Sequence, residues 1–135
     1  MVVFTDVYPD AAHIQHDPRR FEFGAEIADL QDALLDAQLD EFRISTDAAH
    51  PELYARIRGV DGFGWMVDNV TAFARRIHQA GRGPKLSLWF TAMHANLGEL
   101  PELVRLAHRL GVGEVYVQRL VFYGQGLAQG EQSLF

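Results

Sequence analysis

The chain has 135 residues, 48% of them hydrophobic, which suffices for one domain with a sizeable core and not for two ordinary ones. Its 12 basic and 18 acidic residues give a formal charge of -6, which argues against a nucleic-acid partner. No apolar run reaches the roughly 18 residues of a membrane span and no signal peptide is recognisable, so we expect a soluble, cytoplasmic protein. Cysteine is absent, which excludes disulfides, thiolate nucleophiles and thiolate-bound zinc or iron–sulfur sites built from this chain.

The first part of the chain predicts a strand, a long loop and a helix. Residues 2–5 are β-branched and aromatic, as in a buried strand. Residues 8–23 contain two prolines and no sustained period, which predicts a loop that is either functional or mobile. From Gly24 to Ala37, apolar residues recur at helical spacing with acidic residues between them, which predicts an amphipathic helix.

The middle of the chain predicts a strand and two helices. Residues 41–46 alternate with period two, so one side of this strand is apolar and the other carries Arg43 and Ser45. A short helix is expected from Pro51 to Arg58. A longer helix follows a run of glycines and ends at Gly81.

The last part predicts a strand, a helix and a further strand. Residues 86–93 are almost all apolar, which favours a strand covered on both faces. Asn96 and Glu99 have the spacing of a capping box, which predicts a helix from there to Gly111. A strand is expected at 115–121, and residues 123–135 are predicted to form a flexible tail.

Regular alternation of strands and helices predicts an α/β fold with four parallel strands in sequential order and right-handed crossovers. Both a doubly wound sheet and a segment of a barrel satisfy this pattern. An ordinary nucleotide-binding α/β domain is disfavoured, because no Gly-x-Gly-x-x-Gly sequence or P-loop follows a predicted strand.

Several pieces between Phe42 and Leu120 resemble radical S-adenosylmethionine (radical SAM) enzymes that have a partial β/α barrel. One piece resembles the family's strand ending in Ser-x-Asp and the helix ending in Arg-x-Arg-Gly that follows it. Another resembles the next strand, its Asn-Leu turn and a Glu-Leu-Pro-x-Leu helix, and the last matches a Leu-Gly-Val sequence before a further strand. In order, these pieces are residues 43–47, 51–59, 90–97, 99–103 and 110–112.

The resemblance implies a partial (β/α) TIM-like barrel at 1–122, with a loop at 8–23. It would give Ser45, and by position Thr5, a contact to S-adenosylmethionine, and we extend this expectation to Asp47 and Asn96. The alternatives are that Ser45 only fills a strand position, Asp47 caps the following turn and Asn96 caps its helix. We predict no catalytic or metal-binding residue in this chain.

The family's cluster loop, Cys-x-x-x-Cys-x-x-Cys, and its Gly-Gly-Glu turn are both missing from the sequence. A 4Fe-4S cluster would therefore be present only if other sequence supplied it. This favours a fragment of a radical SAM oxidoreductase domain that begins and ends inside the domain and is inactive alone. The alternative is a non-catalytic, dimeric half-barrel scaffold or interaction protein.

Other polar and aromatic residues have two interpretations each. Arg43 and Arg119 either point into the polar interior of a barrel or pair with internal acids or lie at strand ends. Gln118 either bonds a nucleobase or satisfies a neighbouring strand. Trp65 and Trp89 are expected in the core.

The expected partner is a second copy of the chain or the remainder of the barrel. Four strands that do not close leave two unpaired sheet edges and an inner face that bears apolar side chains. Two copies could cover these surfaces through a two-fold interface.

Overall fold

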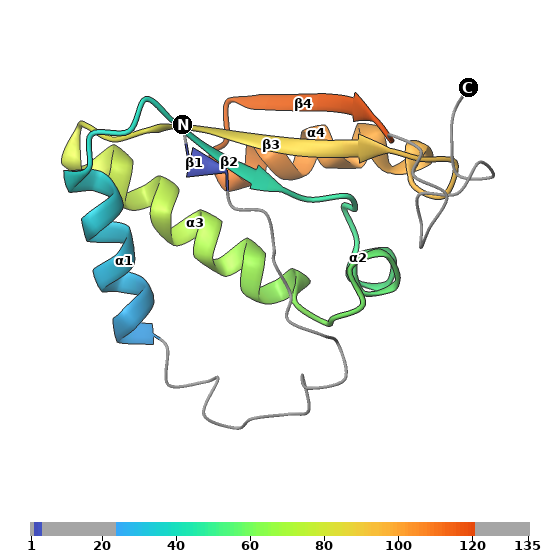
Figure 1. Ribbon diagram of the computed structural model, residues 1–135, viewed down its shortest axis with the longest axis horizontal. Coiled ribbons are helices and arrows are strands. Elements are labelled where there is room, and N and C mark those ends of the chain that lie inside the picture. Colours follow the sequence, from blue (N-terminus) through green and yellow to red (C-terminus); the bar gives the residue numbers. More distant parts are fainter. Residues whose placement is uncertain (1, 4–23, 121–135) are drawn as a thin grey trace.

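The computed structural model describes residues 2–3 and 24–120 (Figure 1). Thr5, the loop predicted at 8–23 and the tail predicted at 123–135 lie outside the described residues. The elements in chain order are β1 (Val2–Val3), α1 (Gly24–Asp36), β2 (Glu41–Ser45), α2 (Pro51–Arg58), α3 (Phe63–Ala80), β3 (Lys85–Ala92), the 3-10 helix η3 (Leu97–Glu99), α4 (Leu100–Leu110) and β4 (Glu114–Arg119).

The strands form one parallel sheet in the order β1-β2-β3-β4. Phe42 of β2 lies opposite Leu86 of β3, and Trp89 of β3 lies opposite Tyr116 of β4. The predicted α/β class and the predicted sequential, parallel strand order are confirmed.

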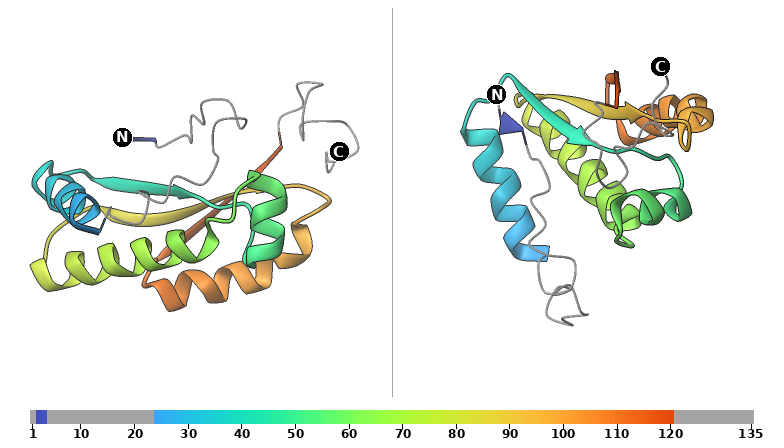
Figure 2. Two further views of the ribbon diagram at one scale, coloured as in Figure 1. Left: turned by 90° about the horizontal axis from the view of Figure 1, so that it is seen from below. Right: turned by 45° about the vertical axis from the view of Figure 1, so that its right-hand side comes forward.

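The described helices α1 to α4 all pack on one face of the sheet (Figures 1 and 2). Leu86, Leu88 and Phe90 of β3 point to that face and are buried, because successive side chains of a strand alternate between faces. The opposite face, which we call the open face, is covered by no described helix. Trp89 and Thr91 lie on it and are only half-buried, so the prediction that both faces of this strand are covered is wrong.

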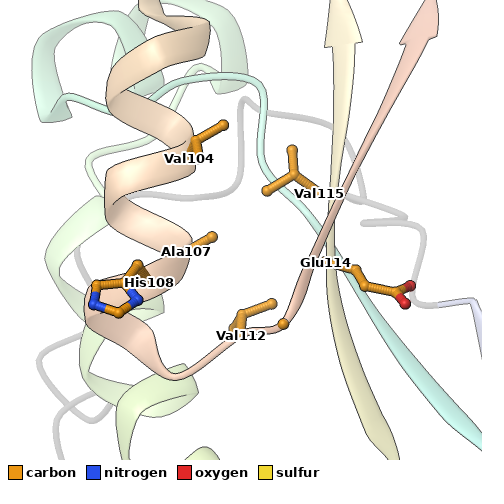
Figure 3. A pocket seen from close by; sticks show the side chains of 7 residues that line it. Val104, Ala107, His108, Val112, Glu114 and Val115 are labelled. Atoms are coloured by element: carbon orange, nitrogen blue, oxygen red, sulfur yellow. The ribbon is translucent and has the colours of Figure 1, made fainter.

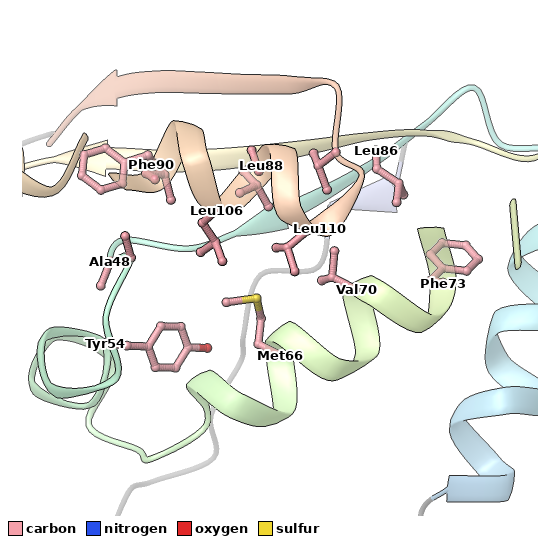
Figure 4. Close-up of a cluster of buried hydrophobic side chains, with 14 of the residues drawn as sticks. Ala48, Tyr54, Met66, Val70, Phe73, Leu86, Leu88, Phe90, Leu106 and Leu110 are labelled. Atoms are coloured by element: carbon pink, nitrogen blue, oxygen red, sulfur yellow. The ribbon is translucent and has the colours of Figure 1, made fainter. Parts of the chain in front are cut away.

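The core lies between the sheet and the helices (Figure 4). Leu88 and Phe90 are completely buried there, and each such side chain contributes roughly 1.5–3 kcal/mol to stability. The buried side chains that α3 and α4 contribute to this core include Met66, Val70, Phe73, Leu106 and Leu110.

The predicted ends of the two longer helices near glycines are confirmed. Gly81 follows α3 with φ 63° and Gly111 follows α4 with φ 73°, a left-handed conformation that favours glycine. Trp65 of α3, in contrast, is 64% exposed, so its predicted core position is wrong. The buried side of α3 is formed by Met66, Val70 and Phe73, and Trp65 lies off this stripe. Within the described part of the chain, no helix is both long and apolar enough to cross a bilayer.

Candidate functional site

The structure brings three of the four predicted cofactor-contacting residues together at the carboxyl ends of β2 and β3. Ser45 ends β2, Asp47 follows it, and Asn96 follows β3. The Asn96 side chain donates a hydrogen bond from Nδ2 to the Asp47 carbonyl oxygen at 2.9 Å. This edge of a parallel sheet is where α/β folds place ligand sites. We call Ser45, Asp47, Arg58, Thr91 and Asn96 the strand-end junction.

Asp47 joins β2, β3 and α2 within the junction. Its Oδ1 accepts a hydrogen bond from the backbone N–H of Thr91 at 2.8 Å, and its Oδ2 lies 2.9 Å from the guanidinium of Arg58. The Asp47 and Arg58 side chains are only 12% and 13% exposed. His50 precedes α2 and makes no side-chain cap. The Asp47 side chain therefore bonds to the neighbouring strand and to Arg58. These contacts differ from the predicted alternative, in which Asp47 caps the following turn.

Ser45 is held by the same arginine. The Arg58 guanidinium donates a hydrogen bond to Ser45 Oγ at 2.6 Å, so one side chain from the end of α2 contacts two predicted site residues. The hydroxyl still has its own hydrogen to donate. Arg58 received no role from the sequence, although it is the second arginine of the Arg-x-Arg-Gly sequence that ends α2.

Asn96 is completely buried and uses its amide group within the chain. Nδ2 donates to the carbonyl oxygens of Asp47 and Thr91, both at 2.9 Å, and Oδ1 accepts from the N–H of Met93 at 2.7 Å. The predicted capping box is wrong, because α4 begins only at Leu100 and Asn96 makes no side-chain cap.

The second member of the predicted capping box, Glu99, also has another partner. Its Oε2 accepts a hydrogen bond from the N–H of Ala49 at 2.6 Å, and its Oε1 lies 3.0 Å from Nδ1 of His50. Glu99 thus connects the turn before α4 to the turn before α2. The side chains of both members of the motif bond to the segment after β2, and neither side chain caps the other residue's backbone.

A second group of side chains crosses the open face from β2 to β4. The Arg43 guanidinium carbon lies 4.3 Å from the centroid of the Trp89 ring. Trp89 stacks on Tyr116 with ring centroids 5.1 Å apart and an interplanar angle of 26°. Stacking and cation–π contacts both stabilise such an arrangement. We call Arg43, Trp89 and Tyr116 the aromatic row. Trp89 was expected in the core and instead lies half-buried on this face.

At its β2 end, the aromatic row is hydrogen-bonded to acidic and hydroxyl groups. Glu41 accepts hydrogen bonds from Arg43 at 2.9 Å and from the Ser87 hydroxyl at 2.8 Å. These two bonds, that from Arg43 first, lower the pKa of the Glu41 carboxyl below 4.5. Trp89 Nε1 donates to the Ser87 oxygen at 3.2 Å. Arg43 therefore does pair with an internal acid, one of its two predicted roles.

At its β4 end, the row is tied to a charged pair. The Tyr116 hydroxyl donates to Glu114 at 2.8 Å, and Lys85 forms an ion pair with the same carboxylate. The hydrogen bonds from Lys85 and then Tyr116 lower the pKa of Glu114, and the bond to Glu114 raises the pKa values of Lys85 and Tyr116. All three side chains are partly exposed to solvent.

The two remaining polar residues of β4 take different positions. Gln118 donates from Nε2 to the Thr91 hydroxyl at 3.2 Å, so it satisfies the neighbouring strand. Arg119 is the last residue of β4, lies opposite Ala92 of the helix-covered face, and is exposed. It therefore lies at a strand end, which is one of its predicted alternatives.

Among the described residues, no group of three or more His, Asp or Glu side chains is arranged to hold a metal ion. A hollow of about 330 Å³ lies between α4 and the start of β4 (Figure 3). Because it lies where β4 begins, it is separate from the strand-end junction. It is lined by Val104, Ala107, His108, Val112, Gly113, Glu114 and Val115.

Comparison with known proteins gives no relative for this chain. No protein-family model matches it, and neither a curated protein nor a solved structure matches it. The radical SAM resemblance therefore stays a prediction that depends on the motif pieces.

Proposed function

We propose that the chain is part of a radical SAM-like (β/α) barrel of the cytoplasm, in which the open face lines the interior, and that it does no chemistry alone. Sequential parallel strands with helices on one side are the arrangement expected of a barrel segment. The observation that carries the proposal is that Ser45 and Asp47, from one motif piece, meet Asn96, from another, at one sheet edge.

The chain does not fit the family's iron–sulfur cluster. Such clusters are held by cysteine thiolates, and the sequence contains no cysteine. The electron that this chemistry requires would have to come from a cluster bound by other sequence. We therefore assign no reaction step to the residues of this chain.

S-adenosylmethionine fits the junction poorly. Both oxygens of Asp47 and both amide hydrogens of Asn96 are already used, which leaves mainly the hydroxyl hydrogens of Ser45 and Thr91 and backbone groups. A neutral hydrogen bond contributes only about 0.5–1.5 kcal/mol net. Since association costs roughly 4 kcal/mol or more, a few such bonds support about millimolar affinity at best.

Two measurements test the proposal. Calorimetric titration of the purified chain with S-adenosylmethionine should give no binding tighter than about millimolar. Anaerobic iron reconstitution followed by a 5′-deoxyadenosine assay should give no product. Stoichiometric cluster incorporation with turnover, or micromolar affinity, would contradict it.

A pair of hydroxyl variants locates any binding that is seen. Ser45→Ala removes a junction hydroxyl that can still donate a hydrogen bond, and it should weaken the signal. Thr71→Ala removes a hydroxyl that bonds to the Val67 carbonyl within α3, so it serves as the matched control. Equal loss in both variants would place the ligand elsewhere.

The second candidate is a non-catalytic half-barrel scaffold or interaction protein. It is favoured by the internal bonds of Asp47 and Asn96, which explain both residues without a ligand. The gene neighbourhood separates the two candidates. An adjacent reading frame that encodes Cys-x-x-x-Cys-x-x-Cys would support the barrel fragment and contradict the scaffold.

A further inference from the structure

The outer edge of β4 has the features of an interaction surface. Within the described residues, β4 pairs only with β3, so one row of its backbone N–H and C=O groups has no strand partner. An unpaired edge is a template for another strand. Three large apolar side chains are exposed beside it, namely Tyr116 at 42%, Val117 at 50% and Val104 of α4 at 54%.

The hollow beneath this edge extends the apolar surface. Val104 and Val115 face each other across it (Figure 3). The surface thus has a hydrogen-bonding edge, an aromatic side chain on the open face and valines on the helix-covered face. A strand added to β4 would cover all three.

We propose that the occupant is β4 of a second copy of this chain, paired antiparallel with Tyr116 on the two-fold axis. A two-fold axis perpendicular to the sheet keeps the helices of both copies on one face, so side chains of the same face must meet across the axis. With Tyr116 opposite its counterpart, Val115 then faces Val117 of the second copy.

The charges of β4 agree with this register. Glu114 faces Gln118 of the second copy, which can donate a hydrogen bond to it, and Arg119 faces Gly113. No like charges lie directly opposite each other. A register shifted by two residues, with Val117 on the axis, would instead place Arg119 opposite Val115. The register centred on Tyr116 is therefore the one that pairs valine with valine and aromatic ring with aromatic ring.

The dimer would join the two aromatic rows. In each copy, the row ends at Tyr116, which stacks on Trp89. Apposition of the two Tyr116 rings across the axis would give one continuous series of stacked groups between the two copies of Arg43. This inference concerns a second copy of the chain and does not depend on the binding of S-adenosylmethionine.

The absence of cysteine allows a direct test of the register. Tyr116→Cys places one thiol per chain opposite itself, within the Cα separation that a disulfide requires. Under mild oxidation we expect nearly complete conversion to a covalent dimer at micromolar concentration. Trp65→Cys, at an exposed position of α3, is the matched control and should remain largely uncrosslinked. Equal crosslinking in both variants, or none at Tyr116→Cys, would overturn the proposal.

Sedimentation of the full chain tests the dimer itself. The 15.2 kDa chain should sediment as a species of twice that mass at micromolar concentration. Val117→Lys puts a charge on the paired edge and should raise the dissociation constant about tenfold or more, whereas Trp65→Lys should not change it. Circular dichroism verifies that each variant is folded. A wild-type monomer, or a folded Val117→Lys dimer of unchanged affinity, would contradict the proposal.

Discussion

The strand-end junction and the aromatic row both connect β2 to β3, yet they differ in burial and in the partners they use. In the junction, Asp47 and Asn96 are buried and bond to backbone groups of other segments. The row is half-exposed, and its contacts are between side chains, with Tyr116 at 42% exposure. Buried polar groups are costly unless they are bonded, whereas exposed ones can bond to water. The junction therefore stabilises the fold, and the row remains accessible for assembly or binding.

The largest effect is expected at Asp47. Asp47→Ala leaves the Arg58 guanidinium buried without this carboxylate and removes the acceptor for the Thr91 N–H. Breaking a buried ion pair costs about 3–5 kcal/mol, which urea unfolding at neutral pH will measure. Asp36→Ala is the control, because its ion pair with Arg82 is exposed and such pairs contribute about 0–1 kcal/mol. Equal losses in the two variants would remove the distinction between junction and surface.

A slightly smaller effect is expected at Asn96. Asn96→Ala leaves the Met93 N–H and two carbonyl oxygens without their side-chain partner in a buried position. We expect a loss of roughly 2–4 kcal/mol in the free energy of unfolding. Hydrogen exchange should also speed up at the Met93 amide. A loss below about 1 kcal/mol would mean that water molecules enter the junction and replace the hydrogen bonds of the Asn96 amide.

The strand order and most of the elements could be predicted from the sequence because their signals are local. The helical spacing from Gly24, the alternation at 41–46 and the stops at Gly81 and Gly111 each depend on neighbouring residues, and sequential order follows from short crossovers. The capping box failed for the same reason. Asn96 and Glu99 have the right local spacing, but their side chains bond to groups 49 to 50 residues away or, for Asn96, also to groups 3 to 5 residues earlier.

The candidate site was only partly predictable because its chemistry is non-local. That Ser45, Asp47 and Asn96 meet follows from parallel strands ending at one edge. Arg58 has no such signal, since its reach back to β2 depends on where α2 packs. The aromatic row likewise requires the register that places Trp89 opposite Tyr116, and hydrophobic composition alone predicts a buried tryptophan.

A small effect on stability is expected when the Arg43 side chain is removed from the aromatic row. Arg43→Ala removes a half-exposed cation–π contact, which contributes about 0.5–1 kcal/mol, and the Arg43 ion pair with Glu41, which contributes about 0–1 kcal/mol. In a Trp65→Phe background, Trp89 is the sole tryptophan, so its fluorescence should report the change directly. Stability should fall by about 2 kcal/mol or less while the emission of Trp89 shifts. A loss as large as that of Asp47→Ala would show that the row, too, stabilises the fold.

The smallest effect concerns the pH dependence that the row adds to stability. The hydrogen bonds from Arg43 and Ser87 lower the pKa of Glu41 in the folded chain below 4.5, its ordinary value. Because the folded pKa is the lower one, the stabilising contribution is complete above pH 4.5 and is lost as the pH falls through the folded pKa.

Glu41→Gln should therefore unfold less steeply than the wild type as the pH is lowered below 4.5. The wild type and the variant both contain Glu102 and Glu114, whose pKa values are lowered by bonds to Arg109 and Lys85. The difference between their two curves of stability against pH therefore isolates Glu41. Glu52→Gln, on the exposed side of α2, controls for the loss of one charge. Acid titrations followed by circular dichroism should separate the two variants. Coincident curves would mean that Arg43 stacks on Trp89 without holding the Glu41 carboxylate.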